Sequence, residues 1–163
     1  MACFFVLHCV MNQEKLHFLS AQFIPLLNNL PAGTIGKWGK MNGQQMVEHV
    51  AGFFKVSTGK IKFPLVTPVE HLPKYKEFLN SDKEFRENTK APVLPEEPLP
   101  VRFATMQEAL ADLDNEIKKF VLLFNNDAQL KILHPVFGEL NFDEWVLLHY
   151  KHVTHHLRQF GVM

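Results

Sequence analysis

The C-terminal segment, Asn141 to Phe160, places the strongest constraint on how this chain can fold. It opens with an Asn-x-x-Glu capping box and is followed by Gly161, two signals that predict a helix between them. At 100° per residue, one sector of that helix about 80° wide carries a set of polar and aromatic residues: Trp145, His149, His152, His156 and Gln159. Burying imidazoles is costly unless hydrogen bonds or a metal ion satisfy them. The surrounding fold must therefore supply partners for these histidines.

Two of these histidines have the spacing with which metal-binding helices hold an ion. His152 and His156 have Cα atoms about 6 Å apart in a helix, because they are separated by four residues at ~1.5 Å per residue. His149 and His156 lie about 10.5 Å apart on the same scale. His152 and His156 are therefore the predicted ligand pair, and a third ligand must come from elsewhere. The alternative is a pair of core histidines held by hydrogen bonds. We predict that His149 is a hydrogen-bonding or pocket-lining group.

Three more amphipathic helices are predicted upstream, because apolar residues recur at steps of three and four. They run from about Asn12 to Asn29 with a perturbation at Pro25, from the Asn42–Gln45 capping box to about Ser57, and from the Thr105–Glu108 capping box to about Phe124. In the second of these helices, His49 falls on the same stripe as Met46 and Phe53. A lone histidine on an apolar stripe is by itself more often a hydrogen-bonded core residue than a metal ligand.

The region of residues 60–104 separates the second helix from the third and contains most of the ten prolines. It is predicted to be an ordered crossover with a short helix from Pro73 to Leu79, either a connection that spans the bundle or a functional lid. No convincing β-hairpin is apparent. Four main helices with one long crossover predict an all-α four-helix bundle with a non-simple topology. We expect a single domain over residues 1–163, with residues 1–11 as an N-terminal extension.

The charge balance and the cysteines exclude several classes of protein. The 17 basic residues are matched by 17 acidic ones and no basic tract stands out, so neither nucleic acid nor a membrane is an expected partner. Cys3 and Cys9 are the only cysteines and have neither the spacing of a zinc finger nor that of a disulfide framework. The opening apolar run lacks the basic start and cleavage site of a signal peptide. A cytoplasmic protein is therefore expected.

Three separated segments, in this order, resemble an uncharacterised bacterial branch of the DinB/YfiT-like superfamily: WGKMNGQQMVEHV, HPVFGEL and YKHVTHHLRQFGV. The resemblance implies a four-helix bundle of up-down-down-up topology that often forms a homodimer. It also implies a divalent metal ion, with Zn²⁺ or Ni²⁺ expected, held by one histidine of the second helix and an HxxxH pair of the fourth. Carried over to this chain, the ligands are His49, His152 and His156. The commoner superfamily ending HRGQ is replaced here by the residues from His156 to Gln159, which read HLRQ.

Superfamily members with assigned activities are similar to metal-dependent thiol S-transferases or isomerases, or to hydrolases. The resemblance therefore implies a metal-dependent transferase or hydrolase acting on a small-molecule substrate, in the first case a low-molecular-weight thiol. No residue of the sequence identifies itself as catalytic beyond the metal ligands. Two alternatives remain open: a non-catalytic bundle that binds a metal or ligand in a stress response, and a metal-free bundle that acts through an interface.

The remaining candidates are weaker. Arg158 is predicted to lie near the site, where it meets either an anionic substrate or a solvent-exposed carboxylate. His134 precedes Pro135 and forms a structural turn or reaches the open end of the bundle. His155 points to the side of its helix and is expected at the surface or an interface. Glu48 is about 100° away from His49 around its helix, so it is a poor candidate for a base acting on the same ion.

Overall fold

The computed structural model describes residues 12–163, so the N-terminal extension of residues 1–11, with Cys3 and Cys9, lies outside the described residues. The described chain is mostly helical and includes one small two-stranded sheet. Residues 12–17 are helical and continue into the π-helix η1 (Phe18–Gln22) and α2 (Phe23–Leu27). The later elements are α3 (Gly43–Ser57), the 3₁₀ helix η2 (Val69–His71), α4 (Leu72–Asn80), α5 (Met106–Asn126), β1 (Ile132–His134), β2 (Gly138–Leu140) and α6 (Phe142–Gln159).

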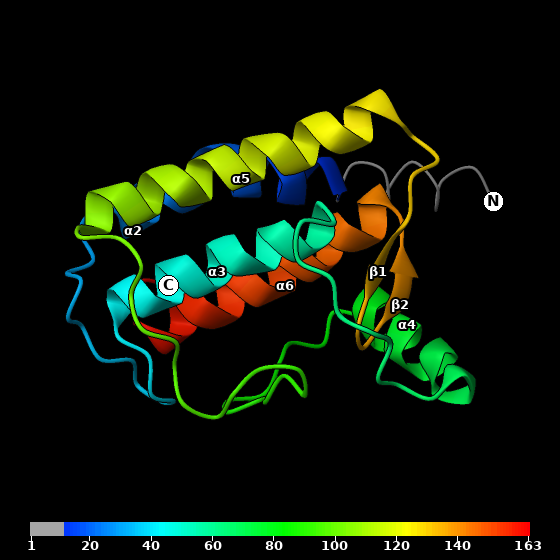
Figure 1. The fold of residues 1–163 in the computed structure, drawn as a ribbon, viewed down its shortest axis with the longest axis horizontal. Helices are drawn as coiled ribbons and strands as arrows, with labels where there is room; N and C mark the ends of the chain where they lie inside the picture. The colour runs from blue at the N-terminus through cyan, green and yellow to red at the C-terminus, as the bar shows by residue number, and fades with distance from the viewer. Residues whose placement is uncertain (1–11) are drawn as a thin grey trace.

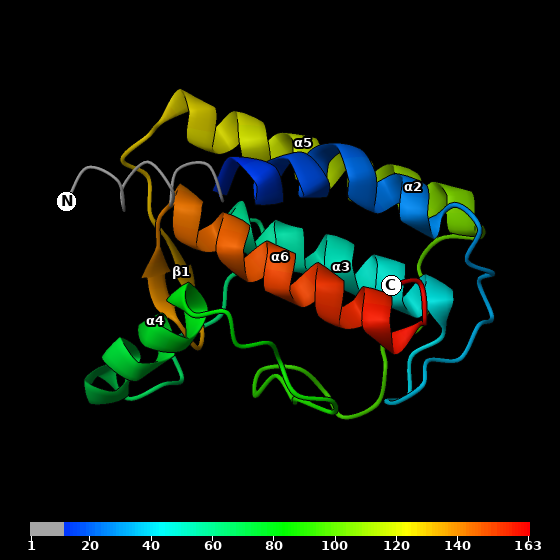
Figure 2. The same cartoon turned by 180° about the vertical axis from the view of Figure 1, so that it is seen from behind.

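Four long helical segments lie side by side (Figure 1 and Figure 2). Helix α5 packs on α3, and the N-terminal segment that ends in α2 lies beside α5 and over α6. Helices α3 and α5 run in one direction, while the N-terminal segment and α6 run in the opposite direction. The two strands and α4 gather at the end of the molecule where α6 begins. The prediction of a helical fold is confirmed at this level.

The three long helices begin where the sequence predicts. Their N-caps are Asn42, Thr105 and Asn141, and each forms a complete capping box with the third residue of its helix. In a capping box two backbone N–H groups that have no partner within the helix are satisfied by side chains, which stabilises the helix start by about 1 kcal/mol. These caps fix where α3, α5 and α6 start.

The N-terminal segment is perturbed just before Pro25, as the sequence predicts. The N–H of Phe23 donates to the carbonyl of Phe18, five residues earlier, so the chain widens into a π-turn. Proline has no N–H and its ring collides with the carbonyl four residues before it, here that of Ala21. A wider turn immediately upstream accommodates that ring without ending the helical segment.

A continuous hydrophobic core joins the helices, and several of its largest side chains are aromatic. Trp145, Phe23, Phe54 and Phe120 are all at most 1% exposed. Each large apolar side chain contributes about 1.5–3 kcal/mol when it is fully buried. Phe120 contacts Phe54 edge-on, with ring centroids 5.7 Å apart, and so ties α5 to α3. Among the described helices, none is both long enough and apolar enough to cross a membrane.

The hairpin of β1 and β2 corrects the prediction that no β-structure is present. The strands are antiparallel, with Ile132 opposite Leu140 and His134 opposite Gly138. Gly138 has a φ of 75°, which favours glycine, and an added Cβ there would make a tight contact of 3.2 Å with the side chain of Leu72 on α4. Strands of only three residues are too short to show the alternation of polar and apolar residues by which a strand is recognised in a sequence.

The crossover of residues 60–104 is ordered and contains the predicted short helix as α4. After α4 it passes along α6, where the ammonium of Lys151 donates to the carbonyls of Ser81 and Lys83. It then reaches α3, where the buried carboxylate of Glu48 accepts the backbone N–H groups of Arg102 and Phe103. The crossover therefore contacts both helices that carry the predicted metal ligands (Figure 1).

Candidate metal centre

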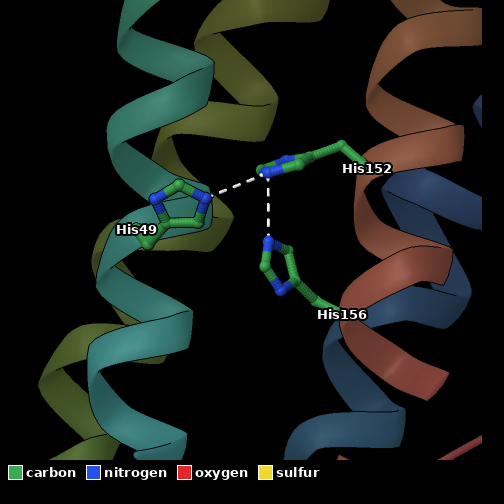
Figure 3. A group of neighbouring side chains, drawn as sticks. All are labelled: His49, His152 and His156. Atoms are coloured by element: carbon green, nitrogen blue, oxygen red, sulfur yellow. Dashed lines mark hydrogen bonds between the residues drawn. The ribbon is translucent and has the colours of Figure 1, made fainter. Parts of the chain in front are cut away.

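The three predicted ligands meet between α3 and α6. His49 projects from α3, and His152 and His156 project from α6 toward it, so that the three rings converge (Figure 3). Nε2 of His152 lies 3.0 Å from Nε2 of His49 and 3.1 Å from Nε2 of His156. One ring nitrogen from each residue falls within 4.8 Å of the others, which is close enough for one metal ion to bind all three. With metal–nitrogen bonds of about 2.0–2.1 Å, two ligand atoms on one ion lie about 3–3.4 Å apart.

The surroundings keep the three imidazoles neutral. His156 is buried, while His49 and His152 are half-buried at the side chain. Burial, and after it the charge of His155, lowers the pKa of His49 to about 4. Burial, followed by repulsion from the other two rings, holds the pKa of His152 well below its usual range. The pKa of His156 is lowered by burial and by His49, although the hydrogen bond to Gln159 acts in the opposite direction. Neutral imidazole is the form that binds metal ions.

A short chain of hydrogen bonds fixes the ring of His156. Its Nδ1 lies 2.7 Å from Oε1 of Gln159, and the side-chain amide of Gln159 donates to the carbonyl of Trp38 at 2.6 Å. Because Oε1 can only accept, Nδ1 of His156 carries the hydrogen and Nε2 keeps a lone pair. Metal-bound histidines commonly donate their second ring N–H to a carbonyl or carboxylate in this way.

The three rings do not satisfy one another by hydrogen bonds alone. Since Nε2 of His156 holds a lone pair, His152 has at most one Nε2 hydrogen for two neighbouring acceptors at 3.0 Å and 3.1 Å. If His49 donates instead, the lone pairs of His152 and His156 face each other. In addition, Nδ1 of His152 is buried and has no hydrogen-bond partner among the described residues. A cation that receives all three Nε2 lone pairs removes the conflict between them, so these residues fit a divalent metal ion.

His149, which lies one turn before His152, belongs to a different environment. It is 0% exposed and its ring stacks on Phe54, with centroids 3.7 Å apart and planes 4° apart. The hydroxyl of Ser57 donates to the carbonyl of Phe54, so Nε2–H of His149 donates to Ser57 at 2.8 Å. Burial, then the proximity of His134, holds the pKa of His149 well below its usual range. His149 is therefore a hydrogen-bonded core residue, and no hydrogen bond links it to the ligand residues.

His134 and Arg158 also have structural partners. Nδ1 of His134 accepts the backbone N–H groups of Val136 and Phe137, which closes the turn of the hairpin, and burial lowers its pKa to about 3. The guanidinium of Arg158 donates to the carboxylate of Glu84 in the crossover at 2.8 Å. Of the two roles predicted for Arg158, the structure contains the contact with a solvent-exposed carboxylate.

Two neighbours of the site differ in how well the sequence predicted them. His155, for which the sequence predicts a place at the surface or an interface, is only 8% exposed, because Trp38 and Phe85 pack against its ring. Trp38 lies in the loop before α3 and Phe85 in the crossover. Neither segment has a helical pattern of apolar residues, so the sequence does not predict that they cover His155. Glu48, as expected, points away from the ligands. Burial alone raises the pKa of Glu48, but hydrogen bonds from Arg102, Gln44 and Phe103 outweigh it, and the net shift is downward.

Comparison with known proteins gives one match. A family model described as "Protein of unknown function (DUF1569)" matches residues 84–163. The matched part holds α5, the hairpin and α6 and therefore includes His152 and His156, but His49 lies outside it. No curated protein and no solved structure matches the chain. The similarity therefore extends to a family without an assigned function.

Proposed function

We propose that this chain is a divalent-metal-binding protein of the DinB/YfiT-like superfamily and that its four long helical segments form an up-down-down-up bundle. The opposed directions of the N-terminal segment and α6 relative to α3 and α5 support the topology. The observation that carries the metal function is the convergence of the Nε2 atoms of His49, His152 and His156. The superfamily resemblance favours Zn²⁺ or Ni²⁺, while three imidazoles by themselves suit several first-row divalent metals.

Three protein ligands are the number typical of a catalytic site, because they leave coordination positions for water or substrate. When bound, such an ion acts as a Lewis acid and lowers the pKa of a water or thiol that it contacts. We propose transfer of a low-molecular-weight thiol as the reaction class, and hydrolysis as the alternative. Both reaction classes are carried over by analogy from the superfamily.

A second candidate is metal binding without turnover. It is favoured by the composition of the cluster, which among the described residues consists of histidines alone. Glu48, the acidic residue next to His49 in the chain, is engaged by Arg102 and Phe103 and points away from the ligands. General acid–base chemistry in this site would therefore depend on the substrate or on solvent.

The test begins with the metal content of tag-free protein purified without added metal and then loaded with Zn²⁺, Ni²⁺ or Mn²⁺. We expect one ion per chain in the wild type and none in His152→Ala. Metal content that is the same in both proteins contradicts the site. A panel of thiols with electrophilic acceptors, assayed with the loaded wild type and with His152→Ala, then separates the two candidates: turnover in the wild type alone supports the transferase, and binding without turnover supports the second candidate.

A further inference from the structure

We propose that Gln159 and the loop of residues 36–39 select the tautomer of neutral His156 that carries its hydrogen on Nδ1, so that the Nε2 lone pair is presented to the metal ion. This inference rests on the metal site proposed above and assigns a positioning role to residues that do not touch the ion. It concerns which nitrogen of a neutral ring carries the hydrogen. A histidine with the hydrogen on Nε2 cannot bind a metal through that atom until the ring changes tautomer.

The first step is the orientation of the Gln159 amide. Its nitrogen lies 2.6 Å from the carbonyl oxygen of Trp38, a contact that only an N–H donor can make. Turning the amide over would bring two carbonyl oxygens together and lose that hydrogen bond. The amide oxygen of Gln159 is consequently the atom that faces Nδ1 of His156 at 2.7 Å. The backbone of Trp38 therefore determines the tautomer of a ring on another element.

The second step is that the loop fits closely around Gln159. The backbone N–H of Lys37 donates to the carbonyl of Gln159 at 2.7 Å, at the end of α6. A Cβ on Gly36 would lie 2.9 Å from Cγ of Gln159 and 3.0 Å from the carbonyl oxygen of Trp38. Gly39 has a φ of 75°, and a Cβ there would lie 2.7 Å from the amide nitrogen of Gln159. Both glycines are thus needed for the loop to hold the amide in place.

The two ligand rings on α6 differ in the hydrogen-bond partner of Nδ1. His156 is buried and has a side-chain partner for Nδ1, whereas Nδ1 of His152 is buried without one among the described residues. Within residues 12–163, no side chain accepts a hydrogen bond from Nδ1 of His152 as Gln159 does from His156. The hydrogen bond from His156 to Gln159 is therefore where a change outside the ligands has the largest effect on the site.

The first experiment measures Zn²⁺ affinity by competition with a chromophoric chelator. Gln159→Met keeps the length of the side chain but removes the acceptor, and we expect it to weaken binding by about 10–100-fold. Ser57→Ala is the matched control, because it removes the hydrogen-bond partner of a buried histidine that is not a ligand. We expect its Zn²⁺ affinity to equal that of the wild type. Wild-type affinity in Gln159→Met, or an equal loss in both variants, contradicts the inference.

The second experiment leaves every polar side chain in place. Gly36→Ala adds a methyl group against Gln159 and Trp38, and we expect it to weaken Zn²⁺ binding by about 10-fold. Gly33→Ala, in the same connection, has nothing within 4 Å of the added Cβ and serves as its control. Equal affinities for the two alanine variants contradict the role of the loop, and this comparison remains available if Gln159→Met does not fold.

The third experiment reads the tautomer directly in metal-free protein. Long-range ¹H–¹⁵N NMR of the wild type should show His156 with the hydrogen on Nδ1, and Gln159→Met should show a changed ratio of the two forms. A merely structural role for Gln159 would not change that ratio, and a wild-type ring protonated on Nε2 overturns the inference. If the wild type binds no metal, the proposed function fails, and the tautomer alone then decides this inference.

Discussion

Three histidines of α6, His149, His152 and His156, share one face of the helix, yet they lie in two different environments. His149 is 0% exposed and stacks on Phe54, and its hydrogen goes to Ser57. One turn later, His152 and His156 face His49 instead, and their Nε2 atoms are 3.1 Å apart. What differs is the residue that α3 places opposite each ring. A hydroxyl gives a neutral imidazole a single hydrogen-bond partner, whereas a third imidazole creates a shared lone-pair site.

The role of a buried histidine depends on the partners that the fold offers to its two ring nitrogens. Every neutral ring has one donor and one acceptor, and burial requires that they be used or left unsatisfied at a cost of about 1–3 kcal/mol. His149 satisfies its donor within the aromatic core. The ligand rings present acceptors to one another, which is unfavourable without a cation. The same residue type therefore stabilises the core in one place and, in the other, forms a cluster that could hold a metal ion.

The largest expected effect is on metal binding. Replacing His49 or His152 by alanine should weaken Zn²⁺ binding by more than the ~10–100-fold expected for residues that only orient a ligand, because each replacement removes a ligand itself. Isothermal titration with Zn²⁺ measures the change. His71→Ala, at an exposed position of η2, is the control and should leave the affinity unchanged. If His71→Ala loses as much affinity as His49→Ala, the loss is not specific to the three candidate ligands and the site assignment is wrong.

The next effect is on stability and falls on the other environment. His149→Ala leaves a cavity between Phe54, Phe120 and Trp145, so the free energy of unfolding should fall by about 2–5 kcal/mol. Urea denaturation of metal-free protein measures it. Folded His149→Ala should still bind one Zn²⁺ per chain. A folded variant that has lost the metal would mean that His149 belongs to the metal centre after all.

Metal binding should in turn stabilise the fold. Free Zn²⁺ at 100 times its Kd should raise the free energy of unfolding of the wild type by about 2.7 kcal/mol, because the ion binds the folded chain. Thermal denaturation with and without Zn²⁺ measures the shift. His152→Ala should show no shift at the same concentration, and a shift of equal size there would place the ion elsewhere.

The smallest effect concerns pH. Because burial holds the pKa of folded His149 well below the ordinary value of 6.5, its contribution to stability is fully present above about pH 6.5 and is lost as the pH falls toward the folded pKa. The polar neighbour of the ring is Ser57 from α3, and the titratable neighbours are His134 from β1 and His152 from α6, whose pKa values burial also lowers. Aromatic side chains from α3, α5 and α6 form the rest of its surroundings. His149→Leu should reduce the slope of stability against pH, below pH 6.5, by about 1.4 kcal/mol per pH unit. Urea denaturation at several pH values, with chelator present, measures the slopes, and equal slopes contradict this account.

The part of the fold that the sequence predicts is the part fixed by local interactions. The capping boxes at Asn42, Thr105 and Asn141 involve residues three apart, and all three form as predicted. The pair His152 and His156 is likewise a matter of spacing on one helix. The sequence does not predict the hairpin of residues 132–140, because three-residue strands carry no usable pattern and the hairpin depends on packing against α4.

The site shows the same division. The histidine spacing on α6 predicts two candidate metal ligands. Their contact with His49 depends on the packing of α6 against α3, and these two helices start about a hundred residues apart. The role of Gln159 could have been suspected from its place in the same sector as the histidines. Its partner, the carbonyl of Trp38, could not, since backbone atoms have no sequence signature. The burial of His155 under Trp38 and Phe85 belongs to the same class of long-range contact.

The sequence by itself determined the helix starts, the spacing of His152 and His156, and the helical character of the chain, because each follows from contacts within a few residues. Only the tertiary structure decided whether each of these histidines faces a hydroxyl group or another imidazole. That choice depends on the residues that α3 and the loop of residues 36–39 bring opposite each ring, and their position is set by the packing of the whole core.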